Sequence, residues 1–205
     1  MQPILLASSS PYRRELLARL GLAFEWASPD IDESPLPSDD TKVNESADDL
    51  VLRLSLAKAK ALSPAYPEYL IIGSDQVAVL AGQIIGKPYS YERAFTQLRA
   101  ASGKQVTFKT GLCLLDALTG QSQACVEEFT VYFHALSDEQ IHHYLTYEQP
   151  YDCAGSFKCE GLGVALFSKL SGDDPNTLIG LPLIRLTQMF RHLGVDPLLL
   201  AKRSS

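Results

Sequence analysis

The order of apolar and polar positions along the chain alternates between short apolar runs and longer amphipathic stretches. Apolar runs of strand length cover residues 3–7, 23–27, 70–79, 106–115, 124–133 and 164–167, and a further short strand follows Gly82. Apolar residues recur at helical spacing over residues 11–20, 46–61, 91–101, 137–147 and 181–193. These periods predict strands and helices that alternate along the chain. Such alternation favours an α/β fold with helices packed on a mixed sheet.

Local end signals support this assignment. Ser10 followed by Pro11 is typical of a helix N-terminus, and Gly21 is a natural end for that helix. The run from Ser137 to Gln140 has the spacing of a capping box. Residues 29–45 are rich in Pro, Asp and Ser, which predicts a long loop. Loops of this length inside compact domains tend to be functional or mobile.

The most informative segment is the apolar run over residues 70–79, because Gly73, Ser74, Asp75 and Gln76 interrupt it. An ionised carboxylate removed from water costs several kcal/mol unless it finds a cation or hydrogen-bond donors. A core strand that carries Asp75 therefore indicates a functional site. The alternative is that the strand simply reaches the surface there and leaves Asp75 in solvent.

Other candidate functional residues are basic and hydroxyl side chains that could bind an anion. Residues 7–14 place three serines, a helix N-terminus and two arginines directly after the first strand, and unpaired N–H groups at such a terminus favour an anion. Lys58 and Lys60 lie on one predicted helix, and Lys87 lies in a turn between Gly86 and Pro88. Lysines suit phosphate binding, although each one alone is more often a solvated surface group.

Carboxylates in the predicted loop could supply a metal site. Asp30, Asp32 and Glu33 offer hard oxygen ligands that, together with Asp75, could hold a divalent cation such as Mg²⁺. The alternative is that these loop acids are solvated. The glycine-rich segment 151–163 carries Glu160, and glycines there would permit close approach of a ligand. Residues 173–182 could be only a loop before the last helix, or could orient a neighbouring group.

Composition narrows the classes of protein that fit. The 205 residues are 46% hydrophobic and 20% charged, which is typical of one globular domain. A net charge of −6 argues against a nucleic-acid polymer as partner. We expect no membrane span and no signal peptide, and therefore a cytoplasmic protein. The spacing of the four cysteines matches no zinc signature, which favours reduced structural thiols.

Seven motifs, in this order, resemble the Maf family of nucleotide pyrophosphatases. They are Leu6-Ala-Ser-Ser-Ser-Pro-Tyr-Arg-Arg14, Asp32-Glu33, Lys58-Ala-Lys60, Gly73-Ser-Asp-Gln76, Gly86-Lys-Pro88, Ala154-Gly155 and Gly180-Leu-Pro182. The resemblance implies a mixed twisted sheet flanked by helices, with two lobes around a cleft, related to the inosine-triphosphate pyrophosphatases. It implies a single bilobed domain over residues 1–197 with a short tail over 198–205, and a homodimer.

The resemblance also implies the reaction and the roles of individual residues. A nucleoside triphosphate would be hydrolysed to a monophosphate and diphosphate, with Asp75 accepting a proton from the attacking water. Phosphates would be bound by Ser8, Arg13, Lys58 and Lys87. Glu33 and Asp75 would hold a divalent metal, Mg²⁺ foremost, with Mn²⁺ or Co²⁺ as substitutes.

Three positions resemble the branch of the family that acts on 7-methyl-GTP. They are Tyr12, Gln76 and Glu160, which replace a basic residue, a threonine and a glutamine of the branch that acts on dTTP and UTP. A carboxylate at Glu160 would suit the cationic methylated guanine, and Tyr12 could stack on it. The chain departs from the branch in a longer loop over residues 36–44, and in Tyr12 where tryptophan is more common. A dTTP or UTP pyrophosphatase, and a nucleotide-binding regulator of septum formation or cell division with incidental hydrolysis, remain as alternatives.

Overall fold

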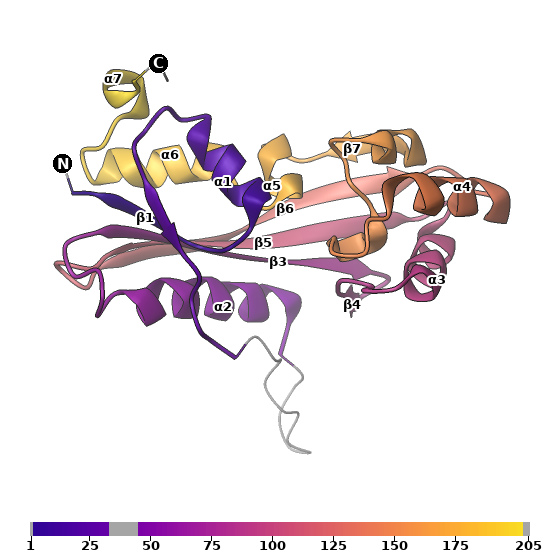
Figure 1. The fold of residues 1–205 in the computed structure, drawn as a ribbon, viewed down its shortest axis with the longest axis horizontal. Coiled ribbons are helices and arrows are strands. Elements are labelled where there is room, and N and C mark those ends of the chain that lie inside the picture. Colours follow the sequence, from indigo (N-terminus) through magenta and orange to yellow (C-terminus); the bar gives the residue numbers. More distant parts are fainter. Residues whose placement is uncertain (1, 33–44, 203–205) are drawn as a thin grey trace. The chain divides into compact units, whose positions relative to one another are not determined.

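The computed structural model describes residues 2–32 and 45–202 and contains one mixed sheet (Figure 1). The strands are β1 (Ile4–Ala7), β2 (Glu25–Ala27), β3 (Leu70–Leu80), β4 (Gln83–Ile85), β5 (Gln105–Asp116), β6 (Ser122–Phe133) and β7 (Phe167–Ser171). Their order is β2-β1-β3-β5-β6-β7, and β4 pairs with β3. β1 runs parallel to β2 and β3, whereas β4 and β7 are antiparallel to β3 and β6. The predicted α/β class with a mixed sheet is confirmed.

The helices follow the predicted order. They are α1 (Pro11–Ala18), α2 (Ala47–Leu62), α3 (Tyr91–Ala101), α4 (Asp138–Glu148), α5 (Pro175–Ile179), α6 (Leu183–His192) and α7 (Pro197–Leu200), with 3₁₀ turns η1 (Ala154–Ser156) and η2 (Leu162–Leu166). Ser10 caps α1 and Ser137 caps α4 with the predicted capping box. Within the described residues, no helix is long and apolar enough to cross a membrane.

Two local predictions are wrong or incomplete. Residues 164–167 were expected to form a strand, but η2 occupies Leu162–Leu166 and β7 begins only at Phe167. A short apolar run does not distinguish a strand from a tight helical turn, and Val164 is 58% exposed while Leu166 is buried. For residues 173–182 the sequence left a loop before the last helix as one of two alternatives, and this segment contains α5, which Asp174 caps at its N-terminus. Most of the predicted loop over 29–45 lies outside the described residues.

The chain divides into two compact units. The first comprises Met1–Asp75, Thr110–Glu127 and Asp174–Ser205, and the second comprises Gln76–Lys109 and Glu128–Asp173. Three of the four divisions fall inside the strands β3, β5 and β6, so Asp75 and its neighbour Gln76 are assigned to different units.

The core of the first unit lies on both faces of its strands. Along β1 and β3, Leu5 and Ile71 pack toward α2, whereas Leu6 and Ile72 pack toward α1 and α6. Figure 1 shows α2 on one side of these strands and α6 on the other. Because successive strand residues point to opposite faces, Gly73 and Asp75 share the α2 face and Ser74 lies on the opposite face.

In the second unit α3 packs against α4 (Figure 1), and four phenylalanine rings form a cluster. Phe157 contacts Phe108, Phe133 and Phe167 edge to face, with ring centroids 4.7 to 5.8 Å apart. Phe157 directly follows η1, so the cluster anchors the segment that carries Glu160. Such ring pairs contribute about 1 kcal/mol each beyond the area that they bury.

Candidate functional site

Asp75 forms a buried ion pair with Lys58. The Nζ atom of Lys58 donates to Oδ1 of Asp75 at 2.6 Å, and the two side chains are 7% and 12% exposed. Lys58 was expected, taken alone, to be a solvated surface group, and this is wrong: Lys58 is buried and only Lys60 is exposed. The alternative that the strand reaches the surface and leaves Asp75 in solvent is wrong, because Asp75 is buried and β3 continues through it to Leu80.

Glycine brings the helix and the strand of this pair together. A Cβ atom on Gly73 would lie 1.9 Å from the carbonyl oxygen of Ser55, and one on Gly111 would lie 2.1 Å from that of Val51. The backbone of α2 therefore rests directly on β3 and β5, closer than any side chain would permit. This close approach places Lys58 within hydrogen-bond distance of Asp75.

The opposite face of β3 is linked to α1 through one carbonyl group. The oxygen of Gly180 accepts hydrogen bonds from Nε of Arg13 at 2.8 Å and from Oγ of Ser74 at 3.1 Å. Buried Ser8 accepts from the backbone N–H of Ser10 at 3.1 Å and so shapes the turn before α1. The motifs over residues 6–14, 73–76 and 180–182 therefore meet at the carbonyl of Gly180.

Asp174 fixes the segment that carries Gly180. Its buried carboxylate accepts from the backbone and side-chain nitrogens of Asn176 at 2.9 and 2.7 Å, and from the backbone N–H of Ile184 at 2.7 Å. One side chain thus caps α5 and the first turn of α6. The hydroxyl of Thr110 adds a bond to the carbonyl of Thr177 at 3.2 Å. Sequence reasoning did not identify Asp174, although an acid before proline is an N-cap signal.

The first unit also places several carboxylates around Arg53. Glu45 forms a double hydrogen bond with this guanidinium, at 2.6 and 2.8 Å. The bond with Glu45 raises the pKa of Arg53, and the charges of Asp32 and Asp75 raise it further. Asp32, Glu45 and Asp75 therefore lie within electrostatic range of the same cation.

The proposed metal ligands lie partly outside the described residues. Glu33 lies outside the described residues, and Asp30 and Asp32 are exposed. Within residues 2–32 and 45–202, no group of three or more His, Cys, Asp or Glu side chains is placed to hold a metal. A donor set limited to carboxylate oxygens nevertheless fits Mg²⁺, which commonly takes one or two carboxylates and completes its shell with water and substrate phosphate.

The α1 residues that follow the cap have different surroundings. Tyr12 is half-buried at the second position of α1. Arg14 stacks on the half-exposed ring of Trp26, with its Cζ atom 4.2 Å from the ring centroid. The sequence suggested Arg14 as a fixed charge near an anion, which stays a prediction, and the structure adds an aromatic partner.

The remaining predicted residues lie in the second unit. Gln76 is half-buried on β3, Lys87 is exposed in the turn between β4 and α3, and Glu160 is exposed after Phe157. The thiol of Cys159 donates to Oε2 of Glu160 at 3.3 Å. The roles of Gln76, Lys87 and Glu160 toward Asp75 stay predictions.

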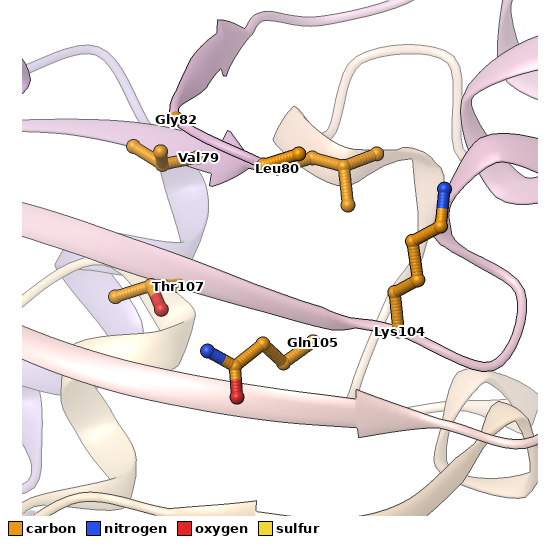
Figure 2. Close-up of a pocket in the computed structure, with 7 residues that line it drawn as sticks. Val79, Leu80, Gly82, Lys104, Gln105 and Thr107 are labelled. Atoms are coloured by element: carbon orange, nitrogen blue, oxygen red, sulfur yellow. The ribbon is translucent and has the colours of Figure 1, made fainter.

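A cavity of about 320 Å³ in the second unit contains none of the predicted residues. Figure 2 shows it lined by the end of β3, the turn at Gly82 and the beginning of β5, with Lys104 as its charged side chain. Val79 and Leu80 supply apolar surface. The predicted site residues that the structure describes therefore lie outside this cavity.

All four cysteines lie in the described part of the chain and are free thiols. Burial raises the pKa of Cys113, Cys153 and Cys159 to about 12. Burial also raises the pKa of Cys125 to about 11. The prediction of reduced, structural thiols fits these environments.

Comparison with known proteins places the chain in a family. The model of the family described as Maf-like protein matches residues 3–193. A protein of Nitrosococcus oceani named 7-methyl-GTP pyrophosphatase is 57% identical, over 93% of both chains. Proteins with the same name from Pseudomonas aeruginosa and Pseudomonas savastanoi pv. phaseolicola are 56% and 58% identical, over 96% of this chain and 99% of theirs. With a match over nearly its whole length, and with the motifs around Asp75 assembled as described, this chain belongs to the Maf-like protein family.

Proposed function

We propose that this chain hydrolyses 7-methyl-GTP to 7-methyl-GMP and diphosphate, and so clears a modified nucleotide. The buried pair of Lys58 and Asp75 carries this proposal, because a carboxylate held inside a core strand is otherwise costly. Relatives named 7-methyl-GTP pyrophosphatase at 56% to 58% identity support the substrate. A cytoplasmic homodimer is part of the same proposal.

Asp75 is the proposed general base. Lys58 holds its Oδ1 atom, which fixes the orientation of the carboxylate and leaves Oδ2 to accept a proton from water. The water oxygen then forms a bond to phosphorus, and the P–O bond between the α and β phosphates breaks. General bases in this position contribute about 10²- to 10⁴-fold to the rate.

Cations and hydrogen-bond donors neutralise the phosphates in this proposal. Ser8, Arg13 and Lys58 belong to the first unit and Lys87 to the second. Arg13 donates its Nε proton to Gly180, which fixes the position of its guanidinium group, and a guanidinium suits phosphate binding. Positive charge lowers the barrier because the charge on the phosphate oxygens rises in the transition state.

We further propose that Asp75 and Glu33 hold a divalent cation, Mg²⁺ foremost. When bound, it would neutralise phosphate charge and orient the substrate. The carboxylates of Asp32 and Glu45 also lie near Arg53, whose pKa their charges raise.

Recognition of the base is assigned to Tyr12, Gln76 and Glu160. The carboxylate of Glu160 is exposed and can accept from the N1 and N2 donors of guanine, while its charge offsets that of the methylated ring. Replacing Glu160 with Gln should lower the ratio of kcat/KM for 7-methyl-GTP over GTP by about tenfold, since both bases offer the N1 and N2 donors and only the methylated ring carries the positive charge that the carboxylate offsets.

The direct test is diphosphate release from 7-methyl-GTP, GTP, dTTP, UTP and ITP, with Mg²⁺ and with a chelator, for the native chain and Asp75→Asn. Metal-dependent turnover that is highest on 7-methyl-GTP and at least about 100-fold lower in the variant would support the proposal. Preference for dTTP or UTP would contradict the roles of the three base-recognition residues. Tight nucleotide binding without turnover would favour a nucleotide-binding regulator.

A further inference from the structure

The turn that carries Lys87 is held by hydrogen bonds on both sides. The carbonyl oxygen of Gly86 accepts from Nε2 of Gln97 at 3.1 Å, which fixes the peptide plane between Gly86 and Lys87. On the other side, the backbone N–H of Tyr89 donates to the carbonyl of Tyr151 at 2.9 Å. Pro88 between them is buried and has a restricted φ angle. The backbone of Lys87 is therefore fixed while its side chain is exposed.

Gln97 uses both ends of its amide. Because the Gly86 carbonyl can only accept, the NH₂ group of Gln97 must face it, and Oε1 faces the hydroxyl of Ser156, which donates. Ser156 is fully buried and has a left-handed backbone, with φ of 63°. Its hydroxyl thus holds the amide in the one orientation that serves Gly86.

This amide joins two of the sequence motifs inside the second unit. Gly86-Lys87-Pro88 is the turn before α3, and Ala154-Gly155 begins η1, which ends at Ser156. Gln97 lies on α3, which Figure 1 shows in the same region as β4. Neither motif nor helix pattern singles out Gln97, because only the tertiary structure places its amide between them.

We propose that Gln97 is a positioning residue that acts through Lys87: it holds the Lys87 turn in the geometry that binds substrate phosphate. This inference rests on the proposed role of Lys87. The amide is separable from the packing of α3, whose buried side chains are Ala94, Leu98 and Ala101. Gln97→Met keeps the length and volume of the side chain and removes both hydrogen bonds.

The experiment is a double-mutant cycle of Gln97→Met and Lys87→Ala, with kcat and KM measured on 7-methyl-GTP and diphosphate used as a product inhibitor. We expect Gln97→Met to raise KM and the diphosphate inhibition constant by about tenfold, a coupling typical of contacting residues, with kcat within about twofold. In the Lys87→Ala background, Gln97→Met should change either constant by less than about twofold. Gln97→Glu, which cannot donate to Gly86, should behave like Gln97→Met.

Thr96→Ala is the matched control, since Thr96 is exposed on the same helix and its hydroxyl bonds only to the carbonyl of Glu92 in the described structure. It should leave KM unchanged. Equal effects of Gln97→Met with and without Lys87 would overturn the inference in favour of a general structural role. A normal KM in Gln97→Met beside a raised KM in Lys87→Ala would overturn the inference alone. A normal KM in Lys87→Ala would overturn the role of Lys87 as well, so the two failures are distinguishable.

Discussion

Lys58 and Asp75 are 17 residues apart in sequence, yet their Nζ and Oδ1 atoms are 2.6 Å apart in the interior of the first unit. The pair joins helix α2 to strand β3. A buried charge requires its partner, because the carboxylate and the ammonium have both lost most of their water. The pair therefore has consequences for stability that can be measured apart from turnover.

Lys58→Met removes the cation that pairs with Asp75 and should lower the free energy of unfolding by about 3 kcal/mol. Combining it with Asp75→Leu should restore much of that loss, because the buried charge is then gone as well. Urea denaturation measures both. Lys60→Met, on the exposed side of the same helix, is the control and should stay within about 0.5 kcal/mol of the native chain. Equal losses for the two lysine variants would contradict a buried pair.

Gly73→Ala should disrupt the packing of α2 on β3. Its new Cβ atom would lie 1.9 Å from the backbone oxygen of Ser55, and a helix backbone cannot yield as a flexible side chain can. We expect a loss of about 3 kcal/mol in the free energy of unfolding. Gly86→Ala meets open space without a positive φ angle and should change it by less than about 0.5 kcal/mol. Thermal unfolding of both variants measures these changes. An unchanged stability of Gly73→Ala would contradict the close approach of α2 to β3.

Asp174→Ala should destabilise the first unit by about 2 kcal/mol, because the N–H groups of Asn176 and Ile184 lose their buried acceptor. Asp174→Asn keeps one acceptor oxygen and should lose less. Asp173 is the exposed neighbour of Asp174, and Asp173→Ala is the matched control. We expect this variant to unfold like the native chain. Urea titration of the three variants checks the order, and similar midpoints for Asp173→Ala and Asp174→Ala would contradict the capping role.

The thiols should react slowly in the native protein. Burial raises the pKa of Cys113 to about 12, so at pH 8 its reactive thiolate is scarce compared with that of an unfolded cysteine, whose pKa is about 8.5. A disulfide reagent at pH 8 should therefore modify the native thiols at least about 100-fold more slowly than those of the denatured chain. Rapid native labelling would show that the thiols are accessible.

The raised pKa of Cys113 also predicts that the protein becomes less stable at high pH. At pH values between about 8.5 and 12, the unfolded chain has released its thiol protons while the native chain keeps the proton of Cys113. The native state then binds more protons than the unfolded state, so the free energy of unfolding should fall as pH rises. Below pH 8 this contribution is fully present. Urea midpoints at pH 7.5 and 10 measure the fall, and Cys113→Ala should make it smaller.

Local sequence signals predicted much of the secondary structure. The apolar period over 46–61 corresponds to α2, and the capping box at Ser137 begins α4. These features depend on neighbours three or four residues apart, so the sequence alone expresses them. The failure at 164–167 has the same origin, because a four-residue apolar run is too short to define a period.

The sequence by itself determined the α/β class, the motif order and Asp75 as the carboxylate that interrupts a core strand. Only the tertiary structure decided that Lys58 is buried against Asp75, that Arg13 and Ser74 share the carbonyl of Gly180, and that Gln97 holds the Lys87 turn. The reason is physical: lysines and glutamines are usually solvated, and nothing in their local sequence shows which of them the packing of a distant strand or turn will bury.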